Sequence, residues 1–218
     1  MTSTRSWQVT GSAETKIGSI NIAGFEALAE HVSLLFKPDG ADYSGVILSN
    51  NEAAAEGQSV EKNCYKRGGL RFLYKSYAPV ENLESFPVDQ LVRVLSTMGR
   101  SYLRQVLQDD DSDAVLAVAW AVCQRDGDYG TLHNHVPPGG DAAGRYSGMF
   151  YLRTPDCITP ATFPNGCLHI ILDNAALYYP PIPGSCVIWP SWMLHGIHPF
   201  RGQGDRLGVA FDFTSRRT

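Results

Sequence analysis

The chain has 218 residues, of which 44% are hydrophobic and 11% aromatic, so it is long enough to bury one substantial core. The formal net charge of −4 lacks the basic excess of a nucleic-acid-binding protein, and no stretch approaches the roughly 18 apolar residues of a membrane span. The five cysteines are scattered without a CxxC pair, and the N-terminus lacks the apolar core of a signal peptide. We expect one cytoplasmic domain over residues 1–218, with a small-molecule partner, no nucleic acid and no membrane; the oligomeric state stays open.

The first half of the chain indicates helices beside a few strands. A weak alternation predicts a strand at 19–23, and residues 25–36 place apolar side chains on one helical face before a Lys-Pro-Asp-Gly stop signal. An aromatic strand is expected at 70–77, and the clearest helix spans residues 88–106. Residues 1–112 are therefore expected to supply helical support and elements on the substrate side.

Short apolar runs separated by Gly, Pro and Asp dominate the second half. Runs this short and this closely spaced are typical of antiparallel β proteins. We expect a mainly β core over residues 113–214, an antiparallel sandwich or barrel with helices packed outside it. The runs cover residues 114–123, 146–153, 167–172, 185–189 and 206–213.

Three histidines have the spacing of a metal site. His133 and His135 stand at positions i and i+2, which project to the same side of an extended strand. His195 follows a Pro-Ser-Trp-Met-Leu segment at the end of another apolar run and could supply a third ligand. Imidazole suits iron, zinc, copper and nickel, and three protein ligands leave coordination positions open for reactants. His169 is interpreted as a barrel histidine and His198 as the fallback ligand.

Arg206 begins the last apolar run, whose alternation separates two different faces. Arg206, Gly208, Ala210 and Asp212 share one face, which carries little bulk and leaves room for a ligand inside a barrel. A guanidinium on that face can hold a carboxylate through both of its oxygens. The other face is apolar and can receive the helices; it carries Leu207, Val209, Phe211 and Phe213.

Four ordered motifs together resemble the iron(II)- and 2-oxoglutarate-dependent oxygenases. The resemblance covers residues 120–213 and is nearest to a branch with an HxH, an SGxYYL-like strand, an FPSWxxH segment and an ER strand. The corresponding segments here are His133-x-His135, Tyr146-Ser147-Gly148-Met149-Phe150-Tyr151-Leu152, Pro190-Ser191-Trp192-Met193-Leu194-His195 and Asp205-Arg206-Leu207.

The resemblance implies a double-stranded β-helix, the cupin-like jelly-roll barrel, with iron(II) at its mouth. His133 and His195 match the two histidine ligands, Arg206 matches the cation that pairs with the far carboxylate of 2-oxoglutarate, and Tyr151 matches a tyrosine whose hydroxyl meets that carboxylate. The implied activity consumes O2 and 2-oxoglutarate and hydroxylates, or otherwise oxidises, an unactivated C–H bond of a small molecule or amino-acid-derived substrate.

His135 departs from the pattern, because most relatives carry aspartate or glutamate there. Either three imidazoles hold the iron, or a nearby carboxylate such as Asp141 substitutes, or His135 is not a ligand; we favour three histidines. Two other functions remain open: a cupin-like three-histidine dioxygenase that does not use 2-oxoglutarate, and a non-catalytic barrel that binds a metal or small ligand.

Overall fold

The computed structural model of the protein describes residues 6–33, 64–67, 70–74, 88–136 and 140–217. Most of the strands in these ranges form one large sheet, in which neighbours are antiparallel except for the parallel pair β4 and β5. The strand order across this sheet is β1 (Gln8–Thr10), β2 (Ile17–Asn21), β10 (Ser185–Pro190), β7 (Arg145–Arg153), β12 (Arg206–Arg217), β5 (Ser112–Gln124), β4 (Leu70–Tyr74) and β3 (Cys64–Arg67).

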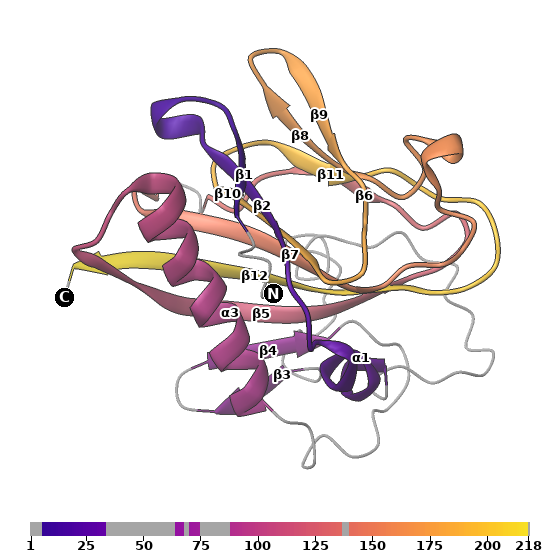
Figure 1. The fold of residues 1–218 in the computed structure, drawn as a ribbon, viewed down its shortest axis with the longest axis horizontal. Coiled ribbons are helices and arrows are strands. Elements are labelled where there is room, and N and C mark those ends of the chain that lie inside the picture. The colour runs from indigo at the N-terminus through magenta and orange to yellow at the C-terminus, as the bar shows by residue number, and fades with distance from the viewer. Residues whose placement is uncertain (1–5, 34–63, 68–69, 75–87, 137–139, 218) are drawn as a thin grey trace.

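A smaller antiparallel sheet packs over one face of the large one (Figure 1). From β5 onwards the chain passes back and forth between the two sheets. The strands β10, β7, β12 and β5 of the large sheet therefore face the strands of the small sheet. This alternation is the double-stranded β-helix, and it confirms the expected mainly β jelly roll with flanking helices. The strands of the small sheet lie in the order β6 (Gly130–His133), β11 (His195–Ile197), β8 (Leu168–Leu172) and β9 (Ala175–Tyr179).

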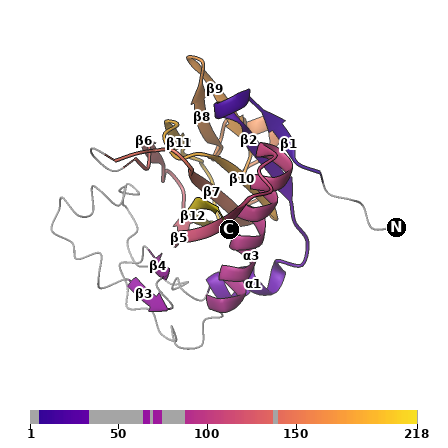
Figure 2. The ribbon, with the colours of Figure 1, turned by 90° about the vertical axis from the view of Figure 1, so that its left-hand side faces the viewer.

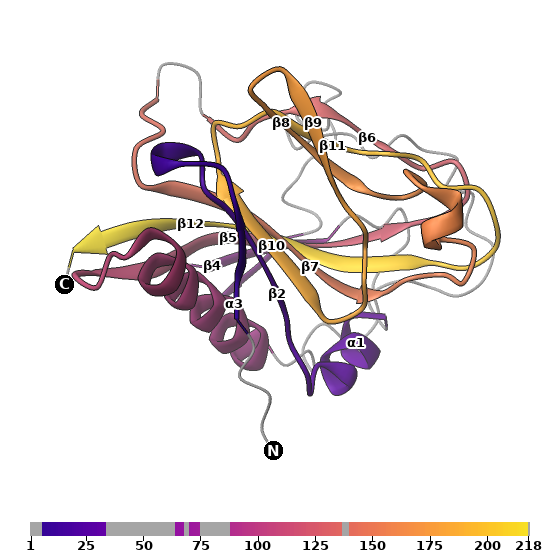
Figure 3. The same cartoon turned by 45° about the horizontal axis from the view of Figure 1, so that its top comes forward.

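Two helices cover the opposite face of the large sheet (Figures 2 and 3). They are α1 (Glu26–Ser33) and α3 (Val88–Tyr102), and α3 continues as a π-helical turn, η4 (Leu103–Leu107). The apolar stripe of α3 and the apolar face of β12 are buried in one cluster, in which α3 lies chiefly against β5 and α1 against β12. The expected division of β12 into a helix-facing side and an interior side is therefore confirmed. The cluster includes Leu91, Leu95, Met98, Leu207, Val209, Phe211 and Phe213.

A second apolar cluster fills the space between the two sheets. It comes from the other faces of the same strands and from the small sheet, so the barrel interior is lined mainly by apolar side chains. Gly208 lies on this side, where an added Cβ would come within 2.5 Å of Met149 Cε and 2.8 Å of the Phe150 carbonyl oxygen. The space beside Gly208 is thus taken up by Met149 and not left open. The cluster includes Val122, Met149, Tyr151, Leu168, Ile170, Val187 and Trp189.

The expected elements differ from the observed ones mainly at their ends. β2 begins at Ile17, two residues before the expected strand, and the helix expected at 25–36 is described only as far as Ser33. The strand expected at 70–77 is observed from Leu70 to Tyr74, and its last positions lie outside the described residues. Short 3-10 turns occur at η1 (Ala13–Thr15) and η5 (Pro160–Thr162). In the described part of the chain, no helix has the length and apolar character needed to cross a membrane.

Candidate active site

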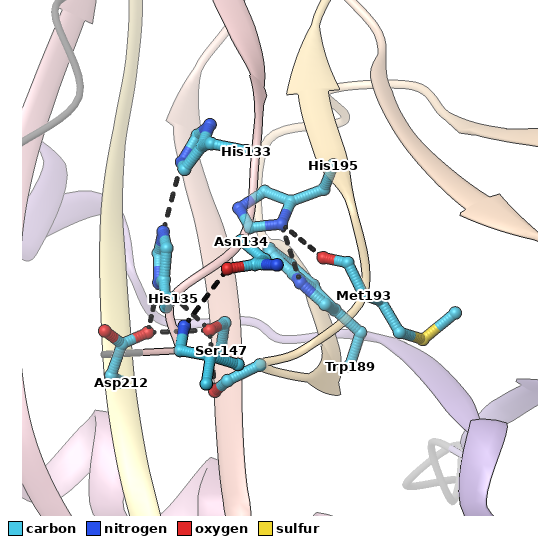
Figure 4. A network of polar contacts seen from close by, with 10 residues as sticks. His133, Asn134, His135, Ser147, Trp189, Met193, His195 and Asp212 are labelled. Atoms are coloured by element: carbon cyan, nitrogen blue, oxygen red, sulfur yellow. Dashed lines mark hydrogen bonds and ion pairs between the residues drawn. The ribbon is translucent and has the colours of Figure 1, made fainter. Parts of the chain in front are cut away.

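Three histidine rings converge between the two sheets (Figure 4). His133 ends β6 and His195 begins β11, and the two residues lie directly opposite each other in the antiparallel register. Opposite residues on one face of a sheet bring their side chains into contact. His135 lies two residues beyond His133, and its backbone N–H donates to the Ser191 carbonyl, 2.9 Å away. One ligating atom from each ring lies within 4.8 Å of the others.

Each imidazole is oriented by a hydrogen-bond acceptor at Nδ1. His133 Nδ1 lies 2.7 Å from the Thr131 carbonyl oxygen, His135 Nδ1 lies 2.7 Å from Asp212 Oδ1, and His195 Nδ1 lies 3.0 Å from the Met193 carbonyl oxygen. Because these oxygens accept, each contact puts the proton on Nδ1 and leaves the Nε2 lone pair available. The Nε2 atoms of His133 and His135 are 3.1 Å apart, so the two lone pairs point into the same small space.

His195 is the most buried of the three rings, at 5% exposure. Burial, and then the neighbouring His135 and His133, hold the pKa of this imidazole well below its usual range. The Trp189 indole packs edge-on to it, with ring centroids 4.7 Å apart. The Trp189 indole N–H also points at His195 Nδ1 from 3.3 Å, and because an indole only donates, it competes with the Met193 carbonyl for that atom. The tautomer with the proton on Nδ1 satisfies the carbonyl and is the one that leaves Nε2 available to a metal. A neutral imidazole in this position is a competent metal ligand.

The other expected candidates lie outside this cluster. Asp141 is exposed, and its carboxylate accepts a hydrogen bond from the backbone of Ala143. The rings of His169 and His198 pack against each other, with centroids 4.8 Å apart, and both contact Tyr178. Among the described residues, the group of ligating atoms close enough to share one ion consists of His133, His135 and His195.

Arg206 is buried in the barrel at 1% exposure, with its guanidinium carbon 5.4 Å from the centre of the Tyr151 ring. Its Nη1 donates to the Gly166 carbonyl at 2.5 Å, whereas Nη2 and the Tyr151 hydroxyl have no hydrogen-bond partner within the described structure. Burial lowers the pKa of Arg206 and raises that of Tyr151 to about 12, so the hydroxyl stays a neutral donor. Buried donors of this kind are costly unless a ligand accepts from them.

Gln124 and Ser185 extend this group, and sequence reasoning did not single them out. Gln124 is fully buried and lies opposite Arg206 in the β12–β5 register, yet neither side-chain atom of its amide has a partner in the part of the chain described. The Ser185 hydroxyl is likewise buried without a partner among these residues. Ser185 precedes Cys186 on β10, and Cys186 pairs with Phe150, the residue before Tyr151 on β7. The cross-strand partner of Arg206 could have been read from the two strand runs once their antiparallel pairing was known.

Residues 118–212 match the family model described as "Putative 2OG-Fe(II) oxygenase". This segment contains the three histidines, Tyr151 and Arg206. The match covers less than half of the chain, so it shows that this segment is similar to that oxygenase family. The family's description names iron(II) and 2-oxoglutarate, so the similarity implies iron(II), 2-oxoglutarate and O2 as the groups to compare with this site.

Several solved structures are similar to this chain at low sequence identity. A prolyl-4-hydroxylase from Pseudomonas putida is 15% identical, with 66% of this chain and 70% of that chain covered and a TM-score of 0.43. A 2OG-Fe(II) oxygenase family oxidoreductase from Burkholderia pseudomallei is 9% identical, with 96% and 72% covered and a TM-score of 0.48. A prolyl hydroxylase from Trichoplax adhaerens, in complex with a hypoxia inducible factor peptide fragment, is 16% identical, with 62% and 59% covered and a TM-score of 0.45. No curated protein matches the sequence.

The residues of this site fit the two groups that the similarity implies. Three imidazoles whose Nε2 lone pairs converge could hold a divalent first-row metal and leave positions open. The unpartnered Arg206 Nη2 and Tyr151 hydroxyl could hold a carboxylate, because both donate and both are buried. The two groups occupy the same barrel interior, between the large sheet and the small one.

Proposed function

We propose that this protein is an iron(II)- and 2-oxoglutarate-dependent oxygenase that hydroxylates an unactivated C–H bond of a small-molecule or amino-acid-derived substrate. In this proposal His133, His135 and His195 hold iron(II), while Arg206 and Tyr151 hold the far carboxylate of 2-oxoglutarate. The observation that carries it is the pairing of two unpartnered buried donors with three convergent imidazoles inside one barrel. The histidines alone would indicate only a metal site, and the two donors alone would indicate only a site for an anion.

The protein's part in the reaction is binding, orientation and exclusion of water. When bound, iron(II) and 2-oxoglutarate supply the oxidising chemistry, in which O2 is consumed, 2-oxoglutarate yields succinate and carbon dioxide, and the substrate carbon gains a hydroxyl group. The Nδ1 contacts hold the three imidazoles so that each Nε2 faces the centre. Arg206 and Tyr151 fix the cosubstrate at the far end, which sets the orientation of the end that faces the metal.

The apolar cluster of the barrel interior matters for the same reason. Met149, Val187 and Trp189 are each at most 3% exposed, so a cosubstrate lying between Arg206 and the histidines would meet few groups that retain water. In such surroundings the electrostatic contacts of Arg206 are stronger than they would be in water. A closed, dry interior also limits side reactions of the oxidising site with solvent.

A three-histidine dioxygenase that does not use 2-oxoglutarate is the second candidate. The replacement of a ligand carboxylate by His135 favours it, because such sites are built from imidazoles alone. Arg206 weighs against this candidate, because a buried guanidinium whose Nη2 has no partner among the described residues suits the far carboxylate of 2-oxoglutarate.

The test is anaerobic titration of the iron(II)-loaded protein with 2-oxoglutarate, followed by assays of succinate release in air. We expect a metal-to-ligand charge-transfer band in the visible range and succinate release that a true substrate stimulates. A library of free amino acids, their derivatives and short peptides is the first substrate set. Iron binding without the band would favour the second candidate, and no iron binding at all would leave a non-catalytic barrel.

Two broader features belong to the same proposal. We propose that residues 1–218 act as one domain, since β1 and β2 join the large sheet beside β10 and α1 and α3 share its core. We also propose a cytoplasmic location, which is in keeping with four cysteines that form no disulfide among the described residues: Cys123, Cys157, Cys167 and Cys186.

A further inference from the structure

The three histidines differ in what lies behind them. Thr131 and Met193 present neutral backbone carbonyls to His133 and His195, whereas His135 meets the carboxylate of Asp212 at 2.7 Å. Neutral imidazoles bring no negative charge to a metal dication. Asp212 is therefore the acidic side chain that contacts this cluster within the described residues, although it is not itself one of the converging ligands.

We propose that Asp212 is a positioning residue that acts on the metal through His135. It would hold the Nδ1 proton of His135, aim Nε2 at the metal and supply the negative charge that the three imidazoles lack. This inference rests on the proposed metal site and adds a residue and a charge to it. A carboxylate behind a ligating imidazole raises the basicity of that ligand and fixes its orientation.

The surroundings of Asp212 hold it in this role. Ser147, which is fully buried on β7, donates to the same Oδ1 from 2.7 Å, and its Oγ also lies 3.0 Å from His135 Nδ1 (Figure 4). Ser191 Oγ lies 2.9 Å from Ser147 Oγ, and the Ser191 carbonyl oxygen accepts a hydrogen bond from the backbone N–H of His135. The His135 ring is thus fixed by side chains from β12 and β7 and by the residue that follows β10.

Partial burial makes the charge effective. The side chains of His135 and Asp212 are 16% and 22% exposed, so water screens their interaction less than it would a surface pair. Trp120 packs beside the His135 ring, with centroids 5.5 Å apart, and covers it on another side. A metal bound at His135 Nε2 would lie one imidazole away from the carboxylate, close enough to be stabilised by its charge.

The test compares Asp212→Asn with Ser147→Ala and measures metal affinity of the metal-free protein, without 2-oxoglutarate. Asparagine keeps the size and an acceptor oxygen but removes the charge, whereas Ser147→Ala keeps the charge and removes one supporting bond. We expect cobalt(II) affinity, measured by competition with a chelator, to fall about 10–100-fold in Asp212→Asn, the usual cost of losing such a partner. Ser147→Ala should fall less than Asp212→Asn. The cobalt(II) absorption bands should shift in Asp212→Asn, which a purely structural role would not cause.

A double-mutant cycle with His135→Asp separates charge supply from folding. His135→Asp places a carboxylate on the metal directly and removes the imidazole through which Asp212 acts. Asp212→Asn should then cost little in the His135→Asp background, and the double variant should bind cobalt(II) more tightly than Asp212→Asn alone. Thermal unfolding of the metal-free variants identifies any that fail to fold.

The outcomes distinguish this inference from the proposed function. If the wild-type protein binds cobalt(II) and Asp212→Asn, correctly folded, binds it equally well with unchanged bands, the role of Asp212 is wrong and the metal site stands. If Asp212→Asn costs the same factor with His135 and with aspartate at that position, the carboxylate does not act through the imidazole. If the wild-type protein binds no cobalt(II) or iron(II), the metal site itself is overturned, and this inference with it.

Discussion

The two polar groups inside the barrel differ in how their hydrogen bonds are satisfied. Around the histidines, the protein supplies an acceptor for every Nδ1, and a chain of side chains fixes His135 from behind. Around Arg206, several buried polar atoms lack a partner among the described residues, including those of Gln124 and Tyr151. The first group is organised before its ligand arrives, whereas the second is complete only when a ligand supplies acceptors.

This difference predicts opposite consequences for substitution at the two groups. Changes at the histidines should remove metal binding and thereby everything that follows from it. Changes around Arg206 should leave metal binding intact and lower the affinity for 2-oxoglutarate. The predictions run from the change that should abolish binding to the one with the smallest effect.

His195→Ala should abolish iron(II) binding, and therefore turnover. The variant loses the most buried of the three imidazoles, and two ligands on a short segment cannot enclose an ion. Metal content after anaerobic loading with iron(II) gives the result. His198→Ala is the matched control, since its ring packs against His169 and Tyr178, and it should load normally. If His195→Ala still loads iron(II) and His198→Ala does not, the third ligand is His198.

Arg206→Leu should bind iron(II) as the wild type does but lose 2-oxoglutarate. Removing the buried cation from a hydrogen-bonded carboxylate pair costs about 2–5 kcal/mol, which raises the dissociation constant by more than an order of magnitude. The anaerobic charge-transfer titration measures it. Arg153→Leu is the control, because that arginine neighbours Leu207 in register but has a side chain that is 42% exposed. Unchanged 2-oxoglutarate affinity in Arg206→Leu would break the contrast between the two groups.

The sequence predicts the strands that contribute to the core better than it predicts how they pair. The apolar runs of β5, β7, β8, β10 and β12 are visible because each buries alternate side chains in one of two cores. β9 and β11 were not anticipated, since β11 has only three residues and β9 has a half-exposed pattern. The turn before β9 did carry a signal: Asp173 and Asn174 have φ of 50° and 63°, as a two-residue hairpin turn requires.

The candidate site divides in the same way. Residue spacing predicts that His133 and His135 come together, and an ordered set of motifs adds His195, Tyr151 and Arg206. The supporting residues carry no such local signal, because Asp212 lies 77 positions from His135 and Gln124 lies opposite Arg206 only once β5 and β12 are paired. Partners set by strand register cannot be read from the chain before the register is known.

Tyr151→Phe should weaken 2-oxoglutarate binding less than Arg206→Leu does. The hydroxyl donates one hydrogen bond to a charged acceptor, and such a bond contributes about 1.5–3 kcal/mol. The phenyl ring keeps the packing against Arg206, so metal affinity and folding should be retained. The charge-transfer titration and the KM for 2-oxoglutarate measure the effect. Tyr146→Phe is the control on the same strand, because Tyr146 packs against Tyr102 and Phe213 in the helix-facing core. Equal effects in both variants would mean that Tyr151 contributes only packing.

Gln124→Met should have the smallest effect on ligand binding, and it should stabilise the ligand-free protein. Replacing a buried amide that has no partner among the described residues by an apolar side chain of similar length removes a desolvation cost of about 1–3 kcal/mol, so the ligand-free protein should unfold at a higher temperature. If the Gln124 amide completes the carboxylate site, the same variant should gain less stability than the wild type when 2-oxoglutarate is added with manganese(II) in place of iron(II). Thermal unfolding with and without these ligands measures both. A variant that is less stable without ligand would show that Gln124 already has hydrogen-bond partners in the free protein. The unsatisfied group would then consist of Arg206 and Tyr151, in contrast to the histidines.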